Sequence, residues 1–322
     1  MAEQTFLDPS LKLRIASFDD VQAVARLSYD IAKMEGDTLF VMTAEELADA
    51  WSEEGFNVAR DVFVVETHEG HVVGSVEFYS EHEHRKFKAD GCVHPEYRGM
   101  GIGSSLLEKM SERALVEMKL AEADAQVTME SLINNKNAGG HALLRNNGYS
   151  PVRYFWRMEV TLETAPASTS FPNGIELRPF IMEEHARAVW QAETEVFRDH
   201  WGSHEFRFED WSNKLTSTNF DSSLWLVAWD GNQIAGFSQN RVRQGIGWIG
   251  TIGVRRPWRN RGLAIALLHH SFAEFYKRGM TTIGLGVDSA NLTGATRVYE
   301  RAGMHVASEH ALYEKVLRTG KI

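Results

Sequence analysis

The stretch RPWRNRGLA, residues 256–264, follows an apolar run typical of a strand and opens a segment with the apolar spacing of a helix. Four arginines stand around Gly262: Arg255, Arg256, Arg259 and Arg261. The stretch HPEYRGMGIG, residues 94–103, has the same character nearer the N-terminus. A strand, a basic loop with glycine and a helix therefore occur twice in this chain.

Other segments repeat in the same order. The matching pairs are LKLRIASFDD (11–20) with IELRPFIMEE (175–184), HVVGSVEF (71–78) with QIAGFSQN (233–240), and LLRNNGY (143–149) with VYERAGM (298–304). The members of each pair lie about 160 positions apart, and self-similarity at so long a period indicates two copies of one domain. We expect an N-terminal domain at 1–161, a linker at 162–174 and a C-terminal domain at 175–322.

Each half has the same pattern of expected elements. An opening strand and a helical region (19–34 or 182–198) precede a hairpin, whose turns are Glu69-Gly70 and Asp230-Gly231. A strand (88–93 or 247–254) then leads into the basic loop. The helix after the loop has one apolar stripe, formed by Leu106, Leu107, Met110 and Ala114 in the first half and by Ile265, Leu268, Phe272 and Phe275 in the second.

A strand, a short helix and a final strand complete each half. The sequence therefore predicts an α/β fold of the α+β sandwich type. We expect two tandem domains, each a mixed, mostly antiparallel sheet flanked by helices.

Composition limits the classes of function. The 322 residues carry a net charge of −10, which disfavours a nucleic-acid-binding surface and weakly favours cationic substrates. Cys92 is the only cysteine, so the chain has no internal disulfide and no cysteine-based zinc site. The N-terminus lacks the features of a signal peptide, and no apolar run has the length of a membrane helix. We expect a soluble cytoplasmic protein, a monomer or weak homodimer, without nucleic-acid or membrane partners.

The basic loops have the chemistry of a pyrophosphate site. A helix N-terminus has unpaired backbone N–H groups that attract phosphate. Glycine lets the backbone approach the anion, and arginine adds charge-assisted bonds to phosphate oxygens. The pattern Arg-x-x-Gly-x-(Gly/Ala) occurs in loop A (98–103) and loop B (259–264). The expected phosphate-binding residues are Arg98, Gly99, Gly101 and Gly103 in loop A, and Arg259, Asn260, Arg261, Gly262, Leu263 and Ala264 in loop B.

These motifs resemble those of the GNAT superfamily of acyl-CoA-dependent N-acyltransferases, in the tandem two-domain form found in mycothiol synthase. The resemblance covers roughly residues 11–160 and 175–318. It implies that the loops hold the pyrophosphate of coenzyme A. It also implies that the preceding strand pairs with pantetheine through its backbone, at Ile252 and Val254 in the second half and at Gly91 and Val93 in the first.

The second half also matches a later motif of the family, VDSANLTGATRVYERAGM, residues 287–304. The resemblance implies that Asn291 helps to hold the cofactor arm and that Tyr299 protonates the departing thiolate as the catalytic acid. Counting back from Gly148, the first half has Leu144 and Lys136 at these positions. We therefore expect the C-terminal domain to be catalytic and the N-terminal domain, with its loop intact, to be non-catalytic.

The general base is open at this stage. The strand GWIGTIGV (247–254) has no acid, whereas the matching strand of the first half has Asp90. The segment EVFRDHWGSHEF (195–206) is dense in polar side chains and follows the first helix, where the superfamily builds its acceptor site. Its expected substrate-binding residues are Glu195, Asp199, His200 and Trp201. The spacing of His200 and His204 lacks a further ligand pattern, so we expect no metal.

The leading interpretation is an N-acetyltransferase that moves an acetyl group from acetyl-CoA to the amine of a small molecule, by direct attack in a ternary complex. One alternative is acetylation of a protein N-terminus or lysine. Another, from a different class, is a non-catalytic sensor of acyl-CoA. An acyl-cysteine intermediate is disfavoured because Cys92 lacks a neighbouring histidine.

Overall fold

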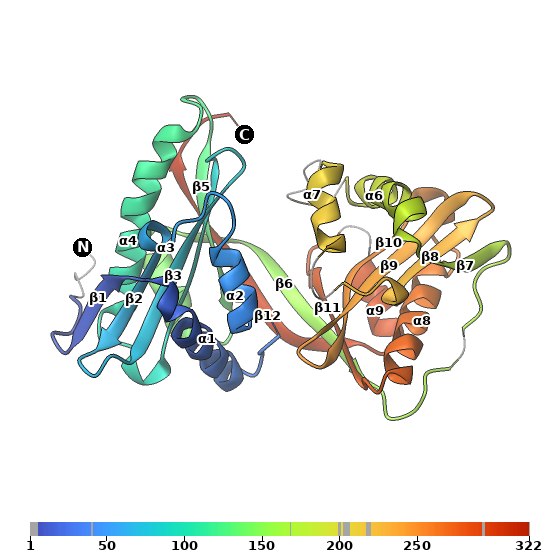
Figure 1. The fold of residues 1–322 in the computed structure, drawn as a ribbon, viewed down its shortest axis with the longest axis horizontal. Coiled ribbons are helices and arrows are strands. Elements are labelled where there is room, and N and C mark those ends of the chain that lie inside the picture. Colours follow the sequence, from blue (N-terminus) through green and yellow to red (C-terminus); the bar gives the residue numbers. More distant parts are fainter. Residues whose placement is uncertain are drawn as a thin grey trace. The chain divides into compact units, whose positions relative to one another are not determined.

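The computed structural model of this chain describes residues 6–39, 41–167, 169–198, 201, 207–216, 220–291 and 294–321. These residues form two compact units, which Figure 1 colours along the sequence. Unit 1 comprises Met1–Tyr154 and Ser308–Ile322, and unit 2 comprises Phe155–Ala307. Each unit is a sheet with helices packed against it, which confirms the predicted fold class.

The sheet of unit 1 has the order β1-β2-β3-β4-β5-β12. Its strands are β1 (Leu11–Ile15), β2 (Val62–Thr67), β3 (Val72–Glu81), β4 (Lys86–Val93), β5 (Val127–Asn134) and β12 (His305–Arg318). Its helices are α1 (Val21–Glu35), α2 (Ala44–Trp51), α3 (Val58–Asp61), α4 (Ile102–Glu117) and α5 (Ala138–Asn146). Only β4 and β5 pair in parallel; the other neighbours are antiparallel.

Unit 2 repeats this plan with the order β7-β8-β9-β10-β11-β6. Its strands are β6 (Ser150–Thr161), β7 (Ile175–Pro179), β8 (Trp225–Asp230), β9 (Gln233–Arg243), β10 (Ile246–Val254) and β11 (Thr282–Asp288). Its helices are α6 (Met182–Phe197), α7 (Phe208–Ser212), α8 (Leu263–Lys277) and α9 (Ala295–Arg301). Here β10 and β11 form the parallel pair. Both sheets are thus mixed and mostly antiparallel, as predicted.

The last strand of each sequence half belongs to the unit built mainly by the other half. Strand β6 pairs with β11, from Phe155 opposite Asp288 to Thr161 opposite Thr282. Strand β12 pairs with β5. The compact units therefore differ from the expected domains 1–161 and 175–322 at these two strands. The two halves repeat one pattern, so the sequence does not specify which copy of the sheet a closing strand joins.

Helices cover both faces of each sheet, because successive strand residues point to opposite sides. In unit 1, Val64 packs with residues of α1 and α2, whereas the adjacent Val65 packs with residues of α4. In unit 2, Val227 packs with α6 and α7, whereas Leu226 packs with α8. Every residue of the predicted α4 stripe is buried, and each large apolar side chain among them contributes about 1.5–3 kcal/mol.

In each unit, the two parallel strands are paired over only three residues. Beyond that point they separate, close to the loop that follows the first strand of the pair. Strand β10 pairs with β11 only over 247–249, and β4 pairs with β5 only over 86–88. Beyond these residues, β10 and β4 continue toward loops B and A, and no strand pairs with that side of them in the described chain. Backbone groups there are therefore free to bind a ligand.

Candidate functional site

Loops A and B have the same backbone conformation. In loop B, Asn260 and Gly262 have φ of 61° and 82°; in loop A, Gly99 and Gly101 have φ of 84° and 80°. The second left-handed residue of each loop is the N-cap glycine of a long helix: Gly262 precedes α8, and Gly101 precedes α4. Left-handed residues alternating with ordinary ones turn successive N–H groups to one side, which produces an anion-binding concavity at the positive end of the helix.

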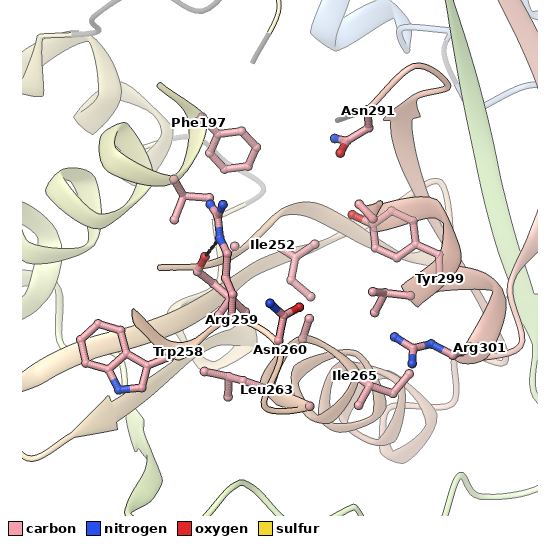
Figure 2. Close-up of a pocket in the computed structure, with 17 residues that line it drawn as sticks. Phe197, Ile252, Trp258, Arg259, Asn260, Leu263, Ile265, Asn291, Tyr299 and Arg301 are labelled. Atoms are coloured by element: carbon pink, nitrogen blue, oxygen red, sulfur yellow. Dashed lines mark hydrogen bonds between the residues drawn. The ribbon is translucent and has the colours of Figure 1, made fainter. Parts of the chain in front are cut away.

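Unit 2 has a pocket of about 210 Å³ above loop B (Figure 2). Strand β10, loop B, α8 and α9 supply most of its lining. The predicted residues that line it are Ile252, Val254, Arg259, Asn260, Gly262, Leu263, Ala264, Asn291 and Tyr299. Arg261 is exposed and is not among the lining residues. The structure therefore brings together the strand, the loop and the later motif that the sequence analysis assigned to one site.

Arg259 is fixed against the strand that precedes its loop. Its Nε donates a hydrogen bond to the backbone oxygen of Val254 at 3.0 Å, which Figure 2 marks as a dashed line. This bond uses one edge of the guanidinium. The terminal nitrogens remain at the pocket lining, where they can bind phosphate oxygens.

Tyr299 is buried on α9, and its ring lines the pocket. Desolvation raises the pKa of its hydroxyl to about 12, because burial penalises the charged phenolate. Among the described residues, none hydrogen-bonds the hydroxyl. The side chain therefore keeps its proton at neutral pH and has a free O–H with which to donate it.

Eight lining residues were not among the predicted site residues, and three of them have aromatic or charged side chains. Phe197 ends α6, Trp258 lies in the short 3-10 helix Arg256–Trp258, and Arg301 ends α9. The Trp258 Nε1 donates a hydrogen bond to Asp230 at 2.8 Å. Trp258 belongs to no motif that the sequence analysis identified, so it could not be predicted. Arg301 could have been found, because it lies two positions beyond Tyr299 on the same short helix.

The expected substrate-binding residues lie elsewhere or outside the described chain. Glu195 is not a lining residue of the pocket; its carboxylate binds the Arg255 guanidinium at 2.7 Å. Trp201 is 44% exposed and does not line the pocket either. Asp199 and His200 lie outside the described residues. Among the residues that the structure describes, none of those expected to bind the acceptor lines the unit 2 pocket.

Unit 1 has a corresponding pocket of about 360 Å³ beside loop A. Its lining includes the predicted residues Val93, Arg98, Gly99, Gly101 and Gly103. Leu144 also lines it, at the position that matches Tyr299. The pocket thus retains the loop but has a hydrocarbon side chain where unit 2 has a phenol.

One expectation about this pocket is corrected. The count from Gly148 assigned the position of Asn291 to Lys136, but the lining residue is Asn137. Its side chain caps α5 by accepting a bond from the Gly140 backbone N–H at 3.0 Å. The count failed because Asn291 lies 12 residues before Gly303, whereas Asn137 lies 11 residues before Gly148. An amide is therefore present in both pockets.

The two loops differ in their surroundings. A Cβ atom at Gly101 would meet the backbone oxygen of Phe6 at 2.2 Å, whereas one at Gly262 would meet only a methyl group of Ile265 at 3.9 Å. The N-terminal segment thus lies on one side of loop A, and Asp8 N donates to Met100 O at 3.0 Å. Arg98 pairs with Glu35 at 3.3 Å. Loop B has no such cover among the described residues.

Cys92 is enclosed between serines, with Ser75 Oγ at 3.4 Å and Ser28 Oγ at 3.6 Å. Burial raises the pKa of its thiol, so the thiolate is disfavoured. This environment is unsuited to a nucleophilic cysteine.

Within the part of the chain that the structure describes, no three His, Cys, Asp or Glu side chains are grouped so that they could hold a metal ion. Among these same residues, no helix combines the length and apolar character needed to cross a membrane.

Comparison with known protein families gives matches in both halves. A model described as the acetyltransferase (GNAT) family matches residues 186–304, and one described as an acetyltransferase (GNAT) domain matches residues 59–151. These two ranges contain loops B and A, respectively.

Individual proteins are similar over longer ranges. A mycothiol acetyltransferase of Catenulispora acidiphila is 24% identical over 233 residues, which cover 70% of this chain and 71% of the relative. The crystal structure of a GCN5-related N-acetyltransferase from Sphaerobacter thermophilus is 34% identical, with a TM-score of 0.85 and coverage of 98% and 99% of the two chains. A tandem GNAT protein from the clavulanic acid biosynthesis pathway shares the fold, with a TM-score of 0.74, 14% identity and coverage of 97% and 100%.

Proposed function

Because this chain belongs to the GNAT family and is an acetyltransferase with two GNAT domains, we propose that unit 2 acetylates the amine of a small molecule, with acetyl-CoA as the donor. The observation that carries the proposal is the pocket in which loop B and Tyr299 meet. GNAT acetyltransferases use acetyl-CoA, and the residues of this pocket fit it.

Loop B would hold the pyrophosphate. Its Gly262 has open space where a side chain would otherwise stand, and its N–H groups lie at the start of α8. Arg259 and Asn260 border the same space. The side of β10 that faces away from β9, at Ile252 and Val254, would pair with the pantetheine arm, and Asn291 would bind it from the other side.

The bound co-substrate supplies an acetyl group activated as a thioester. The backbone N–H groups of 252–254 would stabilise negative charge on the carbonyl oxygen when the amine attacks. Tyr299 would give its proton to the departing sulfur, which suits a phenol that stays protonated at neutral pH. The amine attacks directly in a ternary complex, because Cys92 belongs to the other unit and is disfavoured as a thiolate.

The attacking amine must lose a proton, and β10 has no acid to take it. We assign this role to the polar segment 195–206. Since Glu195 is held by Arg255, the proposed proton acceptor is Asp199 or His200, acting directly or through water.

The small-molecule substrate is supported by the relatives named as mycothiol acetyltransferases. Acetylation of a protein N-terminus or lysine is the alternative within the same chemistry. A non-catalytic sensor of acyl-CoA would not need the phenol of Tyr299. Unit 1, which has Leu144 at that position, is proposed to be non-catalytic.

The test is a screen of amines for release of coenzyme A thiol from acetyl-CoA, run with the full chain and with Tyr299→Phe. We expect at least one small amine to give turnover that the variant loses. Turnover with peptides alone would favour the protein acetyltransferase. Binding of acetyl-CoA without turnover on any amine or peptide would favour the sensor.

A further inference from the structure

The pocket of unit 2 carries positive charge. Two arginines line it, Arg259 and Arg301, and no Asp or Glu lies among its described lining residues. The chain as a whole has a net charge of −10, so this charge is local to the pocket. A positively charged concave site on an acidic protein is suited to a ligand with several negative charges. In the proposed function, loop B and Arg259 bind the pyrophosphate of the donor, and Arg301 has no role.

Arg301 differs from the other arginines near loop B because its guanidinium is unengaged. Arg259 Nε bonds Val254 O at 3.0 Å, and Arg255 binds Glu195 at 2.7 Å. None of the residues that the structure describes forms a hydrogen bond or an ion pair with the Arg301 guanidinium. The residue is also exposed, so a ligand can reach it from solvent. All the donor groups of this side chain are therefore available to a bound molecule.

The place of Arg301 in the pocket indicates which part of the donor it would contact. Figure 2 shows Arg301 and Ile265 at one end of the pocket and Asn291 at the other. Tyr299 lies between Arg301 and Asn291 in this view. In the proposed function, the pantetheine arm runs from loop B along β10 toward Tyr299 and Asn291. The nucleotide of the donor therefore leaves loop B in the opposite direction, past the first turn of α8 and the last residue of α9.

Unit 1 has an uncharged side chain at the matching position. The repeat VYERAGM (298–304) aligns with LLRNNGY (143–149), which places Asn146 opposite Arg301. Asn146 lines the pocket beside loop A, and each of the two residues ends its short helix. The short helix therefore forms in unit 1 without a charge at this position. The arginine of unit 2 is not a requirement of the fold.

We propose that Arg301 binds the 3′-phosphate of coenzyme A, and that it thereby selects coenzyme A over forms that lack this group. The inference rests on the proposed function, which places the pyrophosphate at loop B. A phosphate monoester carries about two negative charges above pH 7. The planar guanidinium pairs with phosphate oxygens through two parallel hydrogen bonds. Arg301 is thus a specificity-determining residue for the donor substrate.

The test compares coenzyme A with dephospho-coenzyme A, which differs only in lacking the 3′-phosphate. Each is titrated into the full chain by calorimetry at pH 8 and low salt, and binding at loop B is the part that Asn260→Asp removes. We expect coenzyme A to bind there at least tenfold more tightly than dephospho-coenzyme A. Arg301→Asn, which installs the unit 1 residue, should weaken coenzyme A at least tenfold and dephospho-coenzyme A less than twofold.

Arg297→Asn is the matched control, because it removes an exposed arginine of the same helix that does not line the pocket. It should leave the ratio of the two affinities within twofold of the ratio in the unaltered chain. Arg301→Lys keeps the charge but loses the planar pair of donors, so its ratio should lie between those of the unaltered chain and Arg301→Asn. Circular dichroism checks that each variant folds.

Two results would overturn the inference alone. One is equal affinity of the unaltered chain for the two ligands at loop B. The other is an equal loss of both affinities in Arg301→Asn, which would assign this arginine to the pyrophosphate. Neither result affects the proposed transferase activity, which is measured separately as thiol release from acetyl-CoA. Absence of coenzyme A binding at loop B would overturn both proposals.

Discussion

Arg255 holds Glu195 through two nitrogens, Nε at 2.8 Å and Nη2 at 2.7 Å, and so ties the last turns of α6 to the residue that precedes the 3-10 helix before loop B. A third nitrogen of the same guanidinium bonds Ile234 O at 3.0 Å. Glu195 was expected to bind substrate. In the structure it instead orients the arginine at the entrance to the loop.

This relationship gives a prediction for Glu195→Gln. We expect the KM for acetyl-CoA to rise several-fold because loop B loses a support, while the KM for the amine stays within about twofold. Steady-state kinetics with each substrate varied in turn measures both. The reverse division would assign Glu195 to the substrate after all.

Tyr299→Phe should lower kcat by about 10²-fold or more, because general acid catalysis commonly contributes that much. The affinity for acetyl-CoA should change little. Tyr149→Phe is the matched control: this tyrosine is equally buried, lies in unit 1 and has no hydrogen-bond partner for its hydroxyl. If both variants keep full turnover, the phenol of Tyr299 has no part in the mechanism.

The two loops can be compared at the positions of Asn260 and Gly99, which share a left-handed backbone. Asn260→Asp should reduce acetyl-CoA binding and turnover at least tenfold, since a carboxylate would face phosphate. Gly99→Asp should leave kcat within a few-fold, and Gly99→Asn controls for the backbone strain. Gly101→Asp is a poorer probe because its Cβ would collide with Phe6. Loss of turnover in Gly99→Asp alone, with the protein folded, would reverse the roles of the two units.

Glu77 makes stability depend on pH in a defined direction. Its pKa rises from 4.5 to about 7 on folding, so the folded chain holds a proton that the unfolded chain releases. The resulting stability is complete below pH 4.5 and is lost as the pH rises to about 7. Between these limits the free energy of unfolding should fall by roughly 1 to 3 kcal/mol more in the unaltered chain than in Glu77→Gln. Urea denaturation across this range measures the difference, and parallel curves would contradict it.

Gly262→Asp should abolish acetyl-CoA binding in unit 2, because a carboxylate would meet phosphate at the start of α8. Gly262→Asn has a side chain of similar size without the charge, and asparagine tolerates the left-handed backbone. It should therefore bind at least tenfold better than the aspartate variant. Equal affinity of the two, measured by calorimetry, would place the pyrophosphate elsewhere.

The parts of the site that were predicted correctly from the sequence are those formed by short, continuous segments. Loop B, α8 and the motif around Tyr299 are contiguous segments whose spacing fixes their geometry, and they meet in one pocket. Partners distant in sequence were not predictable. The ladder that places Glu77 opposite Asp90 and the ion pair of Glu195 depend on packing between elements, and no motif marks them. Asn137 was missed by one position because the spacing between the asparagine and the glycine after the short helix is one residue shorter in the first half than in the second.

Because the closing strands are exchanged between the two halves of the sequence, the folding of each unit depends on both halves. Strand β12, from the second half of the sequence, completes the sheet of unit 1, and β6, from the first half, completes that of unit 2. A fragment that stops in the linker would leave β5 with an open edge, and open edges recruit other chains. Each unit therefore needs strands from both halves of the sequence to complete its sheet, so neither half folds into its full sheet without the other.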